Sequence, residues 1–378
     1  THTGPITGES IDVVSTGAGV NLPLQTNLVN AVSGSAVKDF VFTNFTDLAA
    51  GPITVTGTNA NIILTSVSGD IDVVGNLTAP NLVSLNAPNG TFTLVPPNTI
   101  SANILSHTTS TPPSYDPADV PDTIAVNGNL TINKPGQSIT FGNFVTTGTI
   151  SITAGALTVN GPLVTTGAGK SVTLTAQTGG VTFVGTGSAE ALGTGGTTTI
   201  NAAGPITGTA TNPVSGSTVT LASGGAITLP GVVKAGLLDV TSTGGAITLE
   251  NAKNTIDTLK VSNGNRAVSI VDSKGLSITS VTGGAVSLSL GGHLTQTGPL
   301  VATSATLKST FGNMVLTNAG NDVGTLAIDN GTRIVSYVDK SGLTVAGIKA
   351  GTLSLATAGD VTQSASGPIV ATAATITN

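Results

Sequence analysis

The residues of this chain that are best suited to chemistry are few and widely spread. Its 378 residues include 18 acidic and 12 basic side chains, three His and no Cys. The densest group of carboxylates lies in segment 106–123, where Asp116, Asp119 and Asp122 follow Tyr115 among several Pro residues. Carboxylate oxygens suit Ca²⁺, but this spacing is not that of an EF-hand. We predict no metal site, and we name these four residues as candidate partner contacts on a projecting loop.

Segment 106–123 also has a simpler interpretation. Loops of this composition are usually insertions that a surface corner tolerates without any role in binding. We favour an insertion at a corner of the fold over a functional loop.

No other motif predicts a reactive site. His2, His107 and His293 are scattered and lack the spacing of metal ligands. The run Gly-Ala-Gly-Lys at 167–170 resembles a phosphate loop, but such a loop requires Gly where this chain has Val164. Acid–base catalysis needs clustered carboxylates or bases, which the sequence lacks. We therefore expect no enzyme activity and no cofactor.

Composition narrows the class of protein. The net charge is −6 and no stripe of Lys and Arg is present, so we expect no nucleic-acid partner. No apolar run reaches the ~18 residues of a membrane span. Only 8% of residues are charged, whereas 50 are Gly and many of the others are Thr, Val and Ile. These residue types favour short strands joined by tight turns.

Internal repeats predict how such strands are arranged. Residues 224–229 and 244–249 both read Gly-Gly-Ala-Ile-Thr-Leu, a turn followed by alternating apolar and polar residues. Related hexapeptides begin at Gly179, Gly195 and Gly283. A strand that returns after ~20 residues indicates a solenoid. We predict an all-β parallel β-helix over residues 1–378, with about 19 coils in a rod ~90 Å long.

A longer period covers the C-terminal part of the chain. Residues 249–297 match residues 316–364 at an offset of 67, which defines internal long repeats at 241–309 and 310–378. Each unit is expected to hold about three coils. The pairs Arg266/Asp272 and Arg333/Asp339 recur at this offset, and we expect them on the solvated surface, where ion pairs contribute little.

Aromatic residues are concentrated near the N-terminus. Phe40 and Phe42 are two residues apart, so they share one face of a strand. We expect both to be buried as core bulk rather than to form a binding site.

Three strings of the C-terminal half resemble the repeats of filamentous-haemagglutinin-type bacterial exoproteins: GGAITLENAKNTIDTLKVSN, HLTQTGPLVATSATL and GNMVLTNAGNDVGTLAIDNG. The resemblance is strongest over residues 220–378. It implies a right-handed β-helix, a location at the bacterial cell surface outside the cell, and a role in adhesion, biofilm or surface structure. We see no match in this sequence to the N-terminal secretion domain of that family or to a β-barrel anchor.

The leading hypothesis is therefore a structural or adhesive rod. Both ends of the chain have the pattern of the middle of the array, so we expect end-to-end self-association or continuation of a longer chain. Glycans of a host or matrix surface are the candidate ligands. The alternatives are a β-helical carbohydrate-active enzyme or glycan-binding module, and an ice-binding solenoid with Thr arrays.

Overall fold

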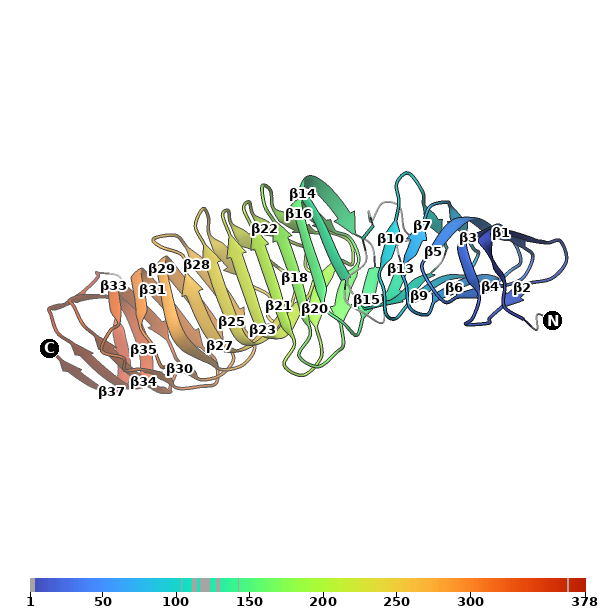
Figure 1. Cartoon of the computed structure of the whole chain (residues 1–378). Helices are drawn as coiled ribbons and strands as arrows, with labels where there is room; N and C mark the ends of the chain where they lie inside the picture. Colours follow the sequence, from blue (N-terminus) through green and yellow to red (C-terminus); the bar gives the residue numbers. More distant parts are fainter. Residues whose placement is uncertain are drawn as a thin grey trace.

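The computed structural model describes residues 4–102, 104–110, 114–115, 123–126, 130–141, 143–365 and 367–378. These residues form a rod in which short strands stack along one axis (Figure 1). The rod has about 16 turns of about 21 residues, and neighbouring turns pair through parallel strands. The predicted parallel β-solenoid is confirmed, with slightly longer and fewer turns than expected. At ~4.8 Å per layer, the stack is about 80 Å long.

The described residues form 37 strands and no α-helix, so no helix among them is suited to cross a membrane. The strands of the first part of the rod are β1 (Thr7–Ser15), β2 (Val20–Leu22), β3 (Leu28–Ala36), β4 (Phe40–Asn44), β5 (Leu48–Val55), β6 (Asn61–Ser66), β7 (Ile71–Val73), β8 (Leu77–Thr78), β9 (Leu82–Ala87), β10 (Phe92–Leu94), β11 (Ile100–Ser101), β12 (Ile104–Thr109), β13 (Thr123–Val126), β14 (Leu130–Phe141), β15 (Asn143–Thr146), β16 (Ile150–Val159), β17 (Pro162–Thr165), β18 (Ser171–Ala176) and β19 (Val181–Phe183). Those of the second part are β20 (Ser188–Ala191), β21 (Thr197–Ala202), β22 (Ile206–Thr207), β23 (Val214–Ser223), β24 (Ile227–Thr228), β25 (Val233–Ser242), β26 (Ile247–Leu249), β27 (Thr255–Ser262), β28 (Val268–Asp272), β29 (Leu276–Leu290), β30 (Leu294–Gln296), β31 (Leu300–Ser309), β32 (Met314–Leu316), β33 (Asp322–Asp329), β34 (Ile334–Asp339), β35 (Leu343–Thr357), β36 (Val361–Gln363) and β37 (Ile369–Thr377).

The core is a set of aliphatic columns that run along the rod axis. In the two identical hexapeptides, Ile227 pairs with Ile247 and Thr228 with Thr248, so these segments occupy neighbouring layers as predicted. Because side chains alternate along a strand, each Ile faces inward and each Thr outward. One inner column passes through eleven layers, and its members are Ile139, Leu157, Val181, Ile206, Ile227, Ile247, Val268, Val286, Ala305, Leu326 and Val345.

The two N-terminal Phe residues belong to such columns. Phe40 and Phe42 are both fully buried in β4, which confirms the predicted core role. Phe40 stacks between Val20 and Ile62 rather than closing the end of the rod.

The 67-residue repeats do not stack directly on each other. The column of Val268 reaches Leu326 three layers later. The residue that corresponds to Val268 in the second long repeat is Val335, which follows Leu326 by nine residues in the chain. Val335 belongs to a different column, between Met314 and Leu353. One long repeat thus holds about three and a half turns, so successive copies are rotated about the rod axis.

The acidic repeat residues Asp272 and Asp339 are buried, contrary to the prediction. They were predicted at the solvated surface, but only 2% of each residue is exposed. The carboxylate of Asp272 accepts hydrogen bonds from the backbone N–H groups of Ile256 at 2.6 Å and Lys274 at 2.7 Å. Burial raises the pKa of Asp272. Both residues therefore act as internal caps of a turn, because each satisfies backbone donors that stacking leaves unpaired.

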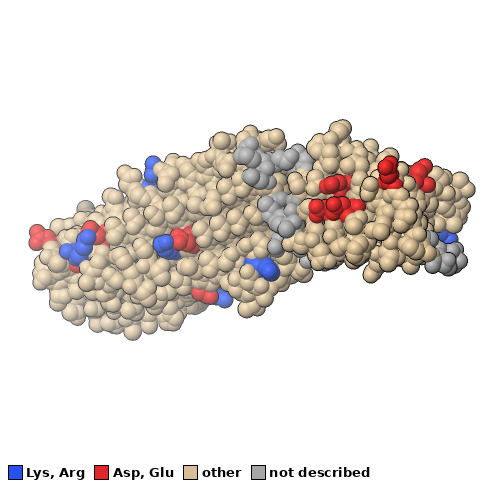
Figure 2. Space-filling view, in the orientation of Figure 1, with Lys and Arg blue, Asp and Glu red and all other residues tan. Residues whose placement is uncertain are grey.

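Charge is distributed unevenly along the rod. Residues 1–125 contain nine acidic side chains and one basic side chain, whereas residues 126–378 contain nine acidic and eleven basic ones. In Figure 2 the acidic side chains accordingly gather over the N-terminal part, while Lys and Arg lie mainly over the rest. The N-terminal third is thus strongly acidic, and the remainder is close to neutral.

Candidate binding trough

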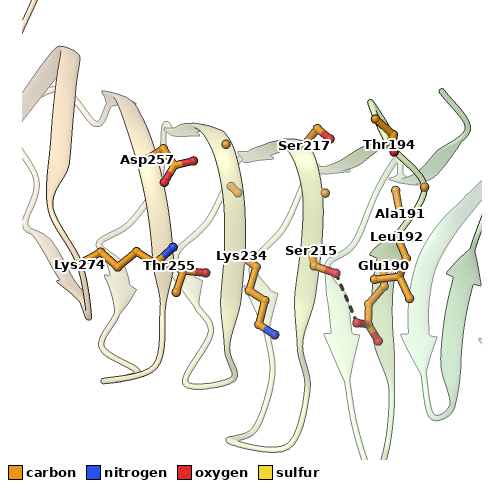
Figure 3. Close-up of a pocket in the computed structure, with 14 residues that line it drawn as sticks. Glu190, Ala191, Leu192, Thr194, Ser215, Ser217, Lys234, Thr255, Asp257 and Lys274 are labelled. Atoms are coloured by element: carbon orange, nitrogen blue, oxygen red, sulfur yellow. Dashed lines mark hydrogen bonds between the residues drawn. The ribbon is translucent and has the colours of Figure 1, made fainter. Parts of the chain in front are cut away.

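An open trough crosses five consecutive layers in the middle of the rod (Figure 3). It encloses about 400 Å³ and is built by β20, β23, β25 and β27, together with the turn before β29. We call this surface the trough; its residues are Glu190, Ala191, Leu192, Gly193, Thr194, Ser215, Gly216, Ser217, Lys234, Ala235, Gly236, Thr255, Asp257 and Lys274.

Strand register places the polar side chains of the trough in two rows. Glu190 pairs with Ser215, Ser215 with Lys234, and Lys234 with Thr255, so these four residues occupy the same position in successive layers. Figure 3 shows Lys274 continuing this first row beyond Thr255. A second row runs alongside it and is formed by Thr194, Ser217 and Asp257.

The space between the rows is hollow because its residues are small. Gly193, Gly216, Ala235 and Gly236 lie there. A Cβ atom at Gly236 would lie 2.8 Å from the carbonyl oxygen of Ser217, so the backbone layers approach closely at this position. The backbone itself therefore forms much of the trough surface.

The charged side chains of the trough are not paired with each other. Among the described residues, the ion pairs are Lys260–Asp239 at 2.8 Å and Lys340–Asp322 at 3.1 Å, and both lie outside the trough. Within it, the hydroxyl of Ser215 donates a hydrogen bond to a carboxylate oxygen of Glu190 at 3.3 Å. Across the residues that the structure describes, the ammonium groups of Lys234 and Lys274 form no ion pair, although the charge of Lys274 also acts on the carboxylate of Asp272.

The spacing of the trough carboxylates suits binding better than glycoside hydrolysis. Glu190 on β20 and Asp257 on β27 are three layers apart, or about 14 Å. The two carboxylates of a glycosidase lie roughly 5–9.5 Å apart around the bond that they cleave.

The structure places only one of the predicted contact residues. Tyr115 is buried rather than exposed on a loop, with 5% of the residue exposed and its ring 5.7 Å from that of Phe92. Asp116, Asp119 and Asp122 lie outside the described residues, so a contact through them stays a prediction.

The first residues of the predicted insertion 106–123 belong to the stack and not to a loop. Residues 106–109 belong to strand β12, which stacks on β9. Ser114 forms a parallel bridge with Thr93. Residues 106–109 and Ser114 therefore continue the stack of layers.

Sequence reasoning missed the trough. Its first row draws on residues that are 19 to 25 positions apart in the chain, and no local motif connects them. A signal was present in the small residues of Ser215-Gly216-Ser217 and Ala235-Gly236, since Gly within a strand often marks a bend or a close approach.

Comparison with protein-family models gives a match to a repeat family. A family model described as "Repeats of unknown function (DUF5649)" matches residues 265–330, which is close in length to the internal repeat of 67 residues. No curated protein and no solved structure matches the chain.

Proposed function

We propose that this chain is an extracellular structural and adhesive rod of a bacterial surface protein or filament. The fold itself is that of a rod-like repeat protein. The observation that carries the proposal is that the strand pairings among the described residues are all parallel from β1 to β37, which gives a long, stiff body with a large lateral surface. The resemblance of the repeats to haemagglutinin-type exoproteins supports the bacterial surface as the location.

End-to-end stacking is part of this proposal. Strands β1 and β37 each pair with a neighbour on one side, β3 and β35 respectively. A further layer, from a continued chain or from a second copy, pairs with the free side of each strand. Backbone groups on such edges favour strand addition.

Electron microscopy of the native material tests the proposal. We expect uniform thin rods, joined end to end or continuous with longer fibres, at the bacterial surface. Compact particles inside the cell, with no rods at the surface, would contradict it.

A β-helical carbohydrate-active enzyme is the catalytic alternative. The separation of Glu190 and Asp257 disfavours hydrolysis in the trough. An assay of polysaccharide depolymerisation at high protein concentration distinguishes the two, because release of shortened chains would favour the enzyme.

Ice binding is a second candidate function, supported by regular hydroxyl columns. Nine consecutive layers present an outward Thr or Ser at one position. These residues are Thr140, Thr158, Thr182, Thr207, Thr228, Thr248, Ser269, Ser287 and Thr306. A thermal-hysteresis measurement tests this function, and its absence at millimolar protein would exclude it.

A further inference from the structure

We propose that the trough binds an extended acidic polysaccharide, such as a polyuronate, with its chain along the rod axis. This inference rests on the proposed adhesive function and names the ligand class and the residues of one contact site.

The direction of the ligand follows from the shape of the trough. Its two rows cross the layers of β20, β23, β25 and β27 instead of following a single strand (Figure 3). A linear polymer in this site therefore lies perpendicular to the strands.

The surface of the trough favours a sugar chain over a peptide. The backbone groups of β23 and β25 are paired with those of adjacent layers, so no free strand edge is available for peptide addition. The space between the rows is formed by Gly and Ala and has no deep apolar pocket for a peptide side chain. Recognition must instead use hydroxyl, ammonium and carboxylate groups, which match the hydroxyl-rich surface of a polysaccharide.

The charge of the ligand follows from the two lysines. Lys234 and Lys274 lie in the same row, about 10 Å apart because one layer separates them. Within the part of the chain that the structure describes, neither ammonium group takes part in an ion pair. Carboxylates at regular intervals along one polymer can contact both lysines, and such charge-assisted hydrogen bonds are the strong ones.

The remaining polar groups contact sugar hydroxyls. Thr194 and Ser217 supply hydroxyls on the opposite row, and Thr255 lies between the two lysines. The carboxylates of Glu190 and Asp257 accept hydrogen bonds from sugar hydroxyls but repel a polyanion. The site is therefore selective for a polymer whose carboxylates face the lysine row.

A binding experiment with matched double variants tests the proposal. The probes are polygalacturonate oligomers, neutral dextran as the uncharged control, and a poly-glutamate peptide. We expect Lys234→Ala/Lys274→Ala to weaken polygalacturonate binding about tenfold or more and to reduce its salt dependence. The matched control, Lys253→Ala/Lys308→Ala, removes two exposed lysines outside the trough and leaves binding unchanged.

A third variant retains the lysines and removes the repulsion. Glu190→Gln/Asp257→Asn is expected to tighten polygalacturonate binding several-fold. Circular dichroism and thermal melting establish that each variant keeps the fold.

Other outcomes overturn the inference. Equal binding by the lysine variant and its control, preference for dextran, or tighter binding of poly-glutamate would each exclude the proposed ligand. The rod proposal fails separately, through the absence of surface rods in electron microscopy.

Discussion

At the scale of single residues, buried amides connect the layers. The side-chain nitrogen of Asn254 donates to the carbonyl oxygens of Leu249 and Val271, both at 3.0 Å, while its oxygen accepts from the N–H of Val233 at 2.8 Å. One side chain thus links its own turn to the turns before and after it. Asn27 and Asn321 make the same three contacts. Their partners lie at the same separations along the chain as the partners of Asn254, to within one residue.

Removing this amide should therefore be costly. We expect Asn254→Ala to lower the free energy of unfolding by roughly 3 kcal/mol, because two buried backbone groups and one part-buried backbone group lose their side-chain partner. Urea denaturation measures the effect. Asn251→Ala is the control, because the half-buried Asn251 makes two solvent-exposed hydrogen bonds, to the carbonyl oxygen of Pro230 and from the N–H of Lys253, and should cost about 1 kcal/mol or less. Equal costs for the two variants would show that burial of the amide is unimportant.

His107 is a polar residue in an otherwise aliphatic part of a column. It stacks between Leu85 and Val126 and is fully buried, and neither ring nitrogen has a hydrogen-bond partner. Burial lowers the pKa of His107 to about 4. In the unfolded chain a His titrates near 6.5.

This difference makes stability depend on pH. Between pH 6.5 and 4 the unfolded chain binds a proton that the folded chain excludes, so the free energy of unfolding should decrease as pH falls, by about 3 kcal/mol in total. His107→Leu should remove that decrease and stabilise the protein. Denaturant titrations at pH 7 and pH 4 measure both effects. The exposed His293 supplies the control His293→Gln, which should keep the wild-type pH dependence, and an unchanged slope in His107→Leu would contradict the prediction.

At the scale of elements, glycine corners determine how closely turns stack. In the two identical hexapeptides, Gly224 and Gly244 lie one above the other. A Cβ atom on Gly244 would overlap the carbonyl oxygen of Gly224. The repeated Gly-Gly pair is therefore needed for close approach of the backbone and not only for flexibility.

Adding one methyl group at this corner should disturb the stack. We expect Gly244→Ala to destabilise the protein by about 1–3 kcal/mol, because the layers around β24 and β26 must move apart. Thermal melting checks this. Gly17→Ala is the control, since no atom lies within 4 Å of a Cβ at that position. Identical melting temperatures for the two variants would argue against a tight corner at Gly244.

At the scale of the whole molecule, the stack is continuous but not uniform. The strands of the sheet of β1, β3, β5, β7 and β10, with β8 and β11, end at Ser101, and Ser114 adds an isolated bridge to Thr93 of β10. Among the described residues, the other sheet alone passes from β9 through β12, β13 and β15 to β17. Since stability in a solenoid is a sum of neighbour contacts, we expect the described strands around β12 and β13 to connect the two parts of the rod less strongly than the strands elsewhere.

The two parts of the rod should consequently unfold separately. We expect calorimetry to show two transitions, one for the layers before β12 and one for those after β15. Leu64→Ala should lower the midpoint temperature of the first transition only, and Leu221→Ala that of the second transition only, because each substitution truncates a buried side chain in one part of the rod. A single transition that both variants shift equally would show that the rod is one cooperative unit.

Local pattern predicted most of the fold and little of the candidate site. Alternation in the hexapeptides at 224 and 244 was sufficient to predict their stacking, because inward and outward directions depend only on neighbours in the chain. The local pattern gave the wrong prediction for Asp272, because an acidic side chain is usually exposed. The backbone donors that stabilise this carboxylate inside the rod are brought to it only by the geometry of the turn. For Tyr115, the Pro-rich surroundings suggested a surface loop, whereas its ring packs against Phe92.

The sequence by itself determined the class of this protein: stacked short strands, an aliphatic interior and a period near 20 residues. The tertiary structure alone decided which outward side chains become neighbours. Successive members of the first trough row, extended back to Val164, are 26, 25, 19 and 21 residues apart. Because turn lengths vary this much while the strands keep their register, counting along the chain cannot align Glu190 with Lys234. Backbone pairing between layers aligns Glu190 with Lys234, and this alignment creates the trough.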